Sequence, residues 1–218
     1  MSSVKKQFRN RFFLLARLVV FLVIVLLATA DSSHARKRVD EEKKYQESAN
    51  YFEEVLAVKK DYMPALLYAG SANHLLGNRE IADNYLSKYI DKNASDLNAK
   101  SMLASTRLYA GDAVSAEHLV NDVLAVNRQD IFALEVLADS YRVRNMHSKH
   151  VDVRRNIAQL EPDLENRKIQ LAIALLESGD QDQAVMVLER QLASSPESEV
   201  TRRQLLLTYR QVGQFSEA

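Results

Sequence analysis

The stretch LLYAGSANHLLGN, from Leu66 to Asn78, decides the fold because parts of it recur at a fixed distance along the chain. The second glycine of this stretch, Gly77, belongs to a set of glycines spaced by thirty-four residues or a multiple of thirty-four: Gly77, Gly111, Gly179 and Gly213. Asn145 is the one interruption, and no insertion or deletion is needed between Met63 and Ala218. A period of thirty-four residues is typical of a solenoid built from helix–turn–helix units.

Two further sets of small residues keep the same spacing. Seven residues before the glycine stand Gly70, Ala104, Ala138 and Ala172, with Leu206 as the exception. Five residues after it stand Ala82, Ala116, His150, Ala184 and Ala218. Two antiparallel helices approach closely only where such small side chains lie between them, so each unit is predicted to be a packed helix pair.

The centre of each unit combines a helix stop with a helix start. Glycine supplies the left-handed residue that ends many helices. Asn78, Asp112 and Asp180 follow directly and can accept a hydrogen bond from the free N–H groups of the next helix. Asp96 and Asp130 are placed to do the same for the following unit. With 3 prolines, 5 glycines and no tryptophan in 218 residues, the composition also suits an all-helical chain.

These residues resemble the tetratricopeptide-repeat (TPR) family. The small–Gly–Ala–Pro pattern of that family is matched by Gly70, Ala82, Ala104, Ala116, Ala138, Ala172, Ala184, Pro162 and Pro196, whereas Lys60, Ala94 and Arg128 depart from its proline. The resemblance implies an all-α, right-handed superhelical solenoid of antiparallel helix pairs with a 34-residue period.

Three segments follow from this pattern. Residues 1–30 are a separate leader, 31–62 are an N-terminal capping segment with a partial repeat, and 63–218 are the array. Within 31–62, the run from Tyr45 to Tyr62 is predicted to be a second helix whose partner begins near Ser32. We expect four full repeats and the start of a fifth, truncated before the polar helix that normally covers the last apolar face.

The leader predicts export. Its basic residues are Lys5, Lys6, Arg9, Arg11 and Arg17, and an apolar run follows from Leu18 to Ala28. Ala28-Thr29-Ala30 has the form of a signal-peptide cleavage site. The alternative is an uncleaved anchor, since residues 12–30 are about long enough to span a bilayer and would then contact the membrane. Either way the repeats are expected in the periplasm, free or anchored to the inner membrane.

Charge and cysteine content narrow the class of protein. The chain has no cysteine, so neither disulfides nor a lipobox is available. It carries 29 basic and 29 acidic residues, and loss of the five basic residues of the leader leaves about five net negative charges. Nucleic acid is therefore not an expected partner, because phosphate binding depends on lysine and arginine.

Neither catalytic residues nor a cofactor site is predicted. The nearest candidate is NMHSKH, where His147 and His150 lie three residues apart, with His118 in the preceding unit. Zinc needs three or four ligands, so an unusual packing position is the simpler interpretation and no metal is expected. A metal-binding sensor or enzyme accessory subunit using His147 and His150 is the alternative to a noncatalytic scaffold.

The predicted partner is a protein or peptide segment, bound along the first helix of every unit. The groove residues are those that point away from the small residues of that helix: Leu67, Ser71, His74, Ser101, Ser105, Leu108, Glu135, Asp139, Arg142, Ile169, Ile173, Leu176, Arg203, Leu207 and Arg210. An apolar centre flanked by charges suits a segment with a hydrophobic anchor and charged ends, although Ile169, Ile173 and Leu176 could instead belong to the core.

Two runs, residues 65–90 and 97–124, look like the TPR proteins associated with the bacterial PEP-CTERM and exosortase system. This resemblance implies an exported scaffold that works with exopolysaccharide export or surface-protein sorting. Inner-membrane assembly machinery would then be its partner.

Overall fold

The computed structural model of the chain describes residues 37–213, and every regular element in this part is an α-helix. The first helix occupies residues 37–58. The helices after it are α2 (Met63–Leu76), α3 (Arg79–Lys92), α4 (Leu97–Tyr109), α5 (Ala113–Val126), α6 (Ile131–Val143), α7 (His147–Leu160), α8 (Glu165–Glu177), α9 (Gln181–Ser194) and α10 (Glu199–Val212). The predicted all-α fold is confirmed.

Successive helices pack as antiparallel pairs, α2 with α3, α4 with α5, α6 with α7 and α8 with α9. The first helix of a unit begins thirty-four residues after the one before it, at Met63, Leu97, Ile131, Glu165 and Glu199. Each pair also packs on the next, so neighbours bury the apolar face that one pair alone leaves open. The period of the sequence is therefore the period of the structure.

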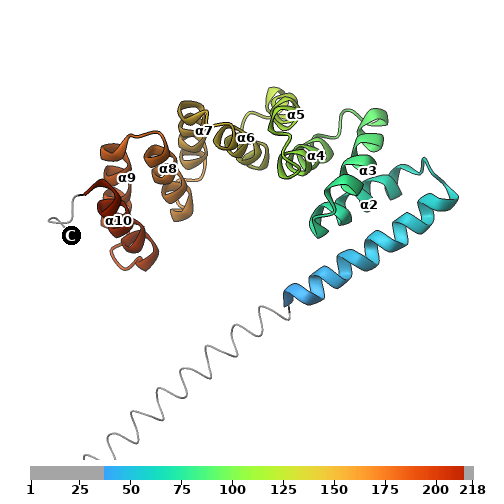
Figure 1. Cartoon of the computed structure of the whole chain (residues 1–218), viewed down its shortest axis with the longest axis horizontal. Helices are drawn as coiled ribbons and strands as arrows, with labels where there is room; N and C mark the ends of the chain where they lie inside the picture. The colour runs from blue at the N-terminus through green and yellow to red at the C-terminus, as the bar shows by residue number, and fades with distance from the viewer. Residues whose placement is uncertain (1–36, 214–218) are drawn as a thin grey trace, which may run out of the picture.

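The pairs stack into an arch (Figure 1). Helices α4, α6 and α8 lie toward its inside, and α5 and α7 lie toward its outside. Contacts between units agree, because α2 packs directly on α4, α4 on α6, and α8 on α10. The side formed by α2, α4, α6, α8 and α10 is called the inner face here, and the side formed by α3, α5, α7 and α9 the outer face.

The turn inside each unit has a left-handed residue, as the recurring glycine predicts. The φ angles are 78° at Gly77, 93° at Gly111, 86° at Gly179 and 76° at Gly213. Asn145, which interrupts the glycines, has a φ of 56° and so adopts the same conformation. Asparagine tolerates this region better than most residues, so the third unit keeps its turn without glycine.

Four of the five predicted helix caps are present. Asp96, Asp112, Asp130 and Asp180 each accept a hydrogen bond from a backbone N–H in the first turn of the next helix. The prediction for Asn78 is wrong, because its side chain donates to Oδ1 of Asn73 at 2.9 Å. Asn73 is buried, so the side chain of Asn78 provides a hydrogen-bond donor for a core amide. The four aspartates instead accept from backbone N–H groups at a helix N-terminus.

The small residues of the first helix lie where the two helices of a pair approach each other. Ala104, Ala138 and Ala172 are fully buried. At Gly70 the approach is close, since a Cβ atom would lie 2.7 Å from Cγ of Leu86 and 3.2 Å from its backbone nitrogen. Only glycine fits there without a shift of Leu86.

The segment before α2 differs from the prediction. Residues 37–58 form one unbroken helix. The predicted start of a partner helix near Ser32 lies outside the described residues. The helix packs on α2, with Leu56 buried beside Ala65 and Leu66. Phe52 stacks on Tyr68 with a distance of 5.0 Å between ring centroids. Residues 37–58 are therefore one helix packed against the first unit.

The leader predicted for residues 1–30 lies outside the described residues. Within 37–213, no helix combines the length and the apolar character needed to cross a membrane.

Candidate partner-binding groove

The predicted groove residues all lie on the first helices of the units, and their exposure divides them into three groups. Arg142, Arg203, Leu207 and Arg210 are exposed. Leu67, Ser71, His74, Leu108, Glu135, Asp139, Ile173 and Leu176 are partly buried. Ser101, Ser105 and Ile169 are buried and belong to the packing between helices.

The apolar centre predicted on α8 is partly core. Ile169 is 7% exposed and belongs to the hydrophobic cluster of α8, α9 and α10. Ile173 and Leu176 pack against this cluster from its edge and keep part of their surface open. The apolar surface of the fourth unit is therefore narrower than the sequence suggests.

His74 connects two inner helices. Its Nδ1 lies 2.8 Å from Oγ1 of Thr106 on α4. Thr106 donates its own proton to the carbonyl oxygen of Met102 at 2.9 Å, so it accepts from His74 and the proton of the ring lies on Nδ1. Burial lowers the pKa of His74, which keeps the ring neutral at pH 7.

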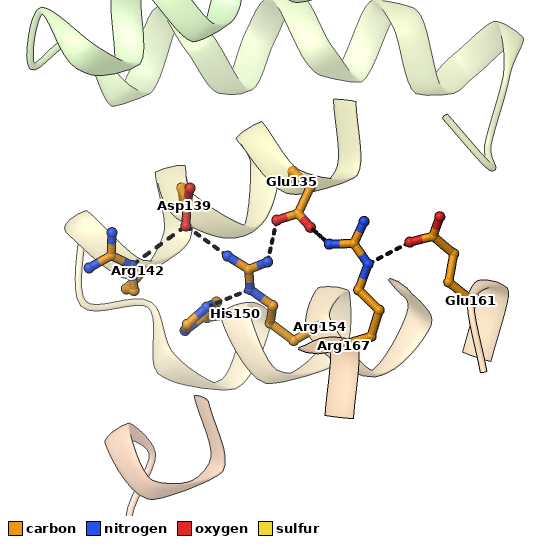
Figure 2. A network of polar contacts seen from close by, with 7 residues as sticks. All are labelled: Glu135, Asp139, Arg142, His150, Arg154, Glu161 and Arg167. Carbon is orange, nitrogen blue, oxygen red and sulfur yellow. Dashed lines mark hydrogen bonds and ion pairs between the residues drawn. The ribbon is translucent and has the colours of Figure 1, made fainter. Parts of the chain in front are cut away.

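A network of charged side chains occupies the inner face between α6 and α8 (Figure 2). Glu135 and Asp139 are one turn apart on α6 and therefore share a face. Arg154 reaches both from α7, donating from Nη2 to Oδ1 of Asp139 at 2.8 Å and from Nη1 to Oε2 of Glu135. Its side chain is only 7% exposed.

Arg167 extends the network to α8. Its Nη1 donates to the second carboxylate oxygen of Glu135, and its Nε donates to Glu161 in the loop before α8. Arg142 adds a looser pair with Asp139 at 3.5 Å. Glu135 thus holds two guanidinium groups from two different units, which fixes α6, α7 and α8 in one arrangement.

The network occupies positions that are apolar or small elsewhere in the array. Arg154 stands at the position of Leu86, Val120 and Leu188, all fully buried. His150 stands at the position of Ala82, Ala116 and Ala184, and Arg167 stands at that of Ala65, Ala99 and Ala133. Three core positions have become polar together, and their partners Glu135 and Asp139 replace Ser101 and Ser105 of the unit before. The third unit is therefore specialised, with a packed polar centre that Arg167 of the fourth unit completes.

His150 belongs to this network. It is 2% exposed, and its Nε2 accepts a hydrogen bond from Nε of Arg154 at 3.2 Å. Its Nδ1 faces Oε2 of Glu177 at 3.3 Å. Burial lowers the pKa of His150, and the charge of Arg154 lowers it further, against the opposing effect of Glu177 and Asp139. The ring is neutral at pH 7 and its Nε2 is already engaged, whereas its buried Nδ1 makes no hydrogen bond within residues 37–213.

The metal alternative gains no support from this geometry. A ligand nitrogen of His150 is taken by a cationic guanidinium group, which repels a metal ion. Across residues 37–213, no three or more side chains of His, Cys, Asp or Glu converge on a point that could hold a metal.

The network borders an open groove of about 370 Å³. The helices on its two sides, α6 and α8, make at most marginal direct contact, unlike the neighbouring pairs of inner helices. Asn166, Gln170 and Ile173 of α8 line it together with Arg142 and Glu177. The groove therefore offers two amides, an apolar side chain and charges of both signs, held by a rigid polar floor.

The sequence predicted the α6 side of this groove and, of its α7 and α8 side, Ile173 alone. Glu135, Asp139, Arg142 and Ile173 were predicted, but Arg154 and Arg167 were not. A usable signal was present, because both arginines break a set of apolar or small residues at the 34-residue spacing.

Solved structures of TPR proteins have the same fold. YrrB, described as a TPR protein with an unusual peptide-binding site, matches with a TM-score of 0.62 and 10% identity over 74% of this chain and 83% of its own. The MamA protein matches with 0.61 and 16% over 81% and 88%. TTC0263, a thermophilic TPR protein of Thermus thermophilus, matches with 0.52 and 20% over 71% and 85%. No family model and no curated protein matches the sequence.

Proposed function

We propose that this chain is a noncatalytic scaffold whose inner face binds an extended segment of a partner protein. The observation that carries the proposal is the groove between α6 and α8, where a rigid polar floor supports side chains that remain free to contact a ligand. YrrB, which has the same fold, is described as having a peptide-binding site. Repeat arrays use such concave surfaces for binding.

The chemistry of the groove suits a polypeptide. Asn166 and Gln170 carry amides that can pair with the N–H and C=O groups of an extended backbone. Ile173 can take an apolar side chain of the partner. Arg142 and Glu177 are the charges at the rim that the network holds least tightly, so they can pair with charged side chains on either side of the anchor.

The proposal includes export. The basic and apolar segment of residues 1–30 and its Ala-Thr-Ala site would place the array in the periplasm or on the inner membrane. The resemblance of residues 65–90 and 97–124 to PEP-CTERM-associated proteins supports a role in exopolysaccharide export or surface-protein sorting. Mass spectrometry of cell fractions tests this part: a start at Asp31 in the periplasm or an intact Met1 in the membrane supports export, and a cytoplasmic chain contradicts it.

Site-specific photocrosslinking in cells tests the groove. A photoreactive amino acid replaces Gln170 on the inner face of the full chain, and a matched variant carries it at the exposed Asn156 of α7. We expect a discrete crosslinked partner from position 170 only. Arg142→Glu should weaken this crosslink without unfolding, because Arg142 is exposed and its single ion pair is loose. Equal crosslinking from both positions, or none from position 170, would contradict the groove.

A further inference from the structure

The outer face has a hollow of its own, between α7 and α9 with α8 beneath. Its volume is about 400 Å³, within the range of small-molecule sites of about 300–1,000 Å³. Its apolar wall is formed by Ala158 of α7, Leu171 of α8 and Val187 of α9. It lies on the opposite side of the array from the groove, so the proposed function does not use it.

The hollow lies where smaller or polar side chains stand at positions that are aliphatic one unit earlier. One unit earlier, the matching positions between α5 and α7 hold Leu124, Leu134, Ile157 and Leu160. Between α7 and α9 the same positions hold Ala158, Lys168, Gln191 and Ser194. Each change removes apolar volume or replaces it with a polar group, and the packing does not close the gap.

Gln191 is the most unusual of these residues. The positions equivalent to it are Tyr89, Val123 and Ile157, all part of the core. Gln191 is itself only 6% exposed and lines the hollow. Its Oε1 is buried and accepts no hydrogen bond from the described residues. A glutamine buried at this position leaves its amide available to a ligand in the hollow.

Three cationic side chains surround the opening. Arg155, Lys168 and Arg190 line it, and no acidic residue does. Arg155 pairs with Asp152 one turn away at 3.3 Å, an exposed contact of little energy. Lys168 and Arg190 have no ion pair within residues 37–213. Three positive charges converge here on a chain whose formal net charge is zero.

We infer that this hollow binds a small anionic amphiphile, a carboxylate with a short aliphatic body. The aliphatic part lies on Ala158, Leu171 and Val187, and the carboxylate lies among Arg155, Lys168 and Arg190. The amide Nε2 of Gln191 donates a hydrogen bond to the carboxylate where the ligand enters the apolar wall. Apolar walls with a few fixed polar groups are typical of small-ligand sites, and the volume suits such a molecule better than a protein segment.

A single tryptophan makes the site measurable, because the chain contains none. Gln159→Trp puts the reporter at the rim of the hollow, and Ala125→Trp puts it at the matching position of the α5–α7 junction. The full chain is placed in zwitterionic vesicles and titrated with octanoate. We expect a saturable change in fluorescence for Gln159→Trp and none for Ala125→Trp. Acetate, sulfate and octanol should give no saturable response, since each lacks one half of the ligand.

Variants separate binding from a nonspecific response. Adding Lys168→Gln and Arg190→Gln should weaken octanoate binding at least tenfold. Gln191→Ile, which restores the residue of the preceding unit, should abolish it, and Ala158→Leu fills the hollow from α7 if Gln191→Ile fails to fold. An equal response of the Ala125→Trp reporter, an unchanged affinity in a folded filled variant, or a response to octanol or to an acidic peptide alone would overturn the inference.

Discussion

The second and third units of the array fill the interface between their two helices with different side chains, apolar in one and charged or polar in the other. In the second, Val120 and Ala116 of α5 fill the interface with α4 as an apolar pair. In the third, Arg154 and His150 of α7 stand at the matching positions and are buried as well. The helices of the two units begin thirty-four residues apart, so the same repeat accepts either an aliphatic or an ionic centre.

The comparison shows what an ionic centre requires. A buried guanidinium group is tolerated only with carboxylates in place, and α6 supplies Glu135 and Asp139 where α4 has Ser101 and Ser105. The cost of desolvation makes this centre a poor source of stability. It gives the inner face a fixed set of charges, which an aliphatic centre cannot do.

The largest expected effect comes from Arg154→Ala. It leaves a cavity and two carboxylates that have lost their shared guanidinium group. We expect a loss of about 3 kcal/mol in the free energy of unfolding, at the low end for broken buried ion pairs because Glu135 keeps Arg167 and Asp139 keeps Arg142. Urea denaturation followed by circular dichroism measures it, with hydrogen exchange to locate the loss in α6–α8.

Arg154→Leu is the matched control, since leucine is the residue of the first and fourth units at this position. It should cost less than Arg154→Ala, because it restores apolar packing against Ala138. A cost for Arg154→Ala below about 0.5 kcal/mol would mean that the network adds nothing to the fold.

Gly70→Ala probes the close approach of α2 and α3. The new methyl group would press on Cγ of Leu86, and overpacking costs about 1–3 kcal/mol against a gain of about 1 kcal/mol from helix propensity. We expect a net loss of about 1 kcal/mol, measured by thermal and urea unfolding.

The second unit provides the compensating change for Gly70→Ala. It pairs Ala104 with Val120, so Gly70→Ala combined with Leu86→Val should cost less than the sum of the two single changes. Additive losses in this double-mutant cycle would contradict the proposed clash.

Most of the fold was predictable because it repeats. Glycine recurs at Gly77, Gly111 and Gly179, and several matches at one spacing rarely arise by chance. The spacing therefore predicts the turn even where Asn145 replaces glycine. The long helix of residues 37–58 occurs once and was predicted less well. The predicted cap at Asn78 failed because a buried amide competes for its side chain, which no local pattern reveals.

The candidate site was only half predictable for a related reason. Position on the first helix identifies Glu135 and Asp139 as facing the groove. It does not reveal that Arg154 and Arg167 reach them from other helices, because long side chains cross between units. The interruptions at these positions point to a special unit, but the pairing of each arginine needs coordinates.

The helix caps extend the comparison at a smaller scale. Asp112 caps α5 by accepting from the backbone N–H of Ser115 at 3.0 Å, whereas Met146 before α7 provides no such bond. Asp112→Ala should lower the free energy of unfolding by about 1 kcal/mol. Asp112→Asn keeps an acceptor and should lose much less. If both variants lost the same amount, the charge at the helix end and not the hydrogen bond would carry the effect.

The smallest expected effect is a pH dependence of stability that originates at His150. Burial and Arg154 hold the pKa of His150 below its ordinary value of 6.5, so above that pH the ring is neutral in both the folded and the unfolded chain. As the pH falls below about 6.5 the unfolded chain binds a proton that the folded chain does not, and stability decreases with falling pH.

His150→Ala, which restores the alanine of the other units, should therefore flatten the decrease in stability between pH 7 and pH 5. His74 is also buried with a lowered pKa, so His74→Ala should remove a separate part of the same decrease. His118 is exposed, and His118→Ala serves as the control. Urea midpoints measured across this pH range give the slope of each variant. A slope for His150→Ala equal to that of His118→Ala would contradict the prediction. It would mean that Glu177 and Asp139 allow His150 to bind its proton in the folded chain. The third unit would then keep its ionic centre at low pH as well.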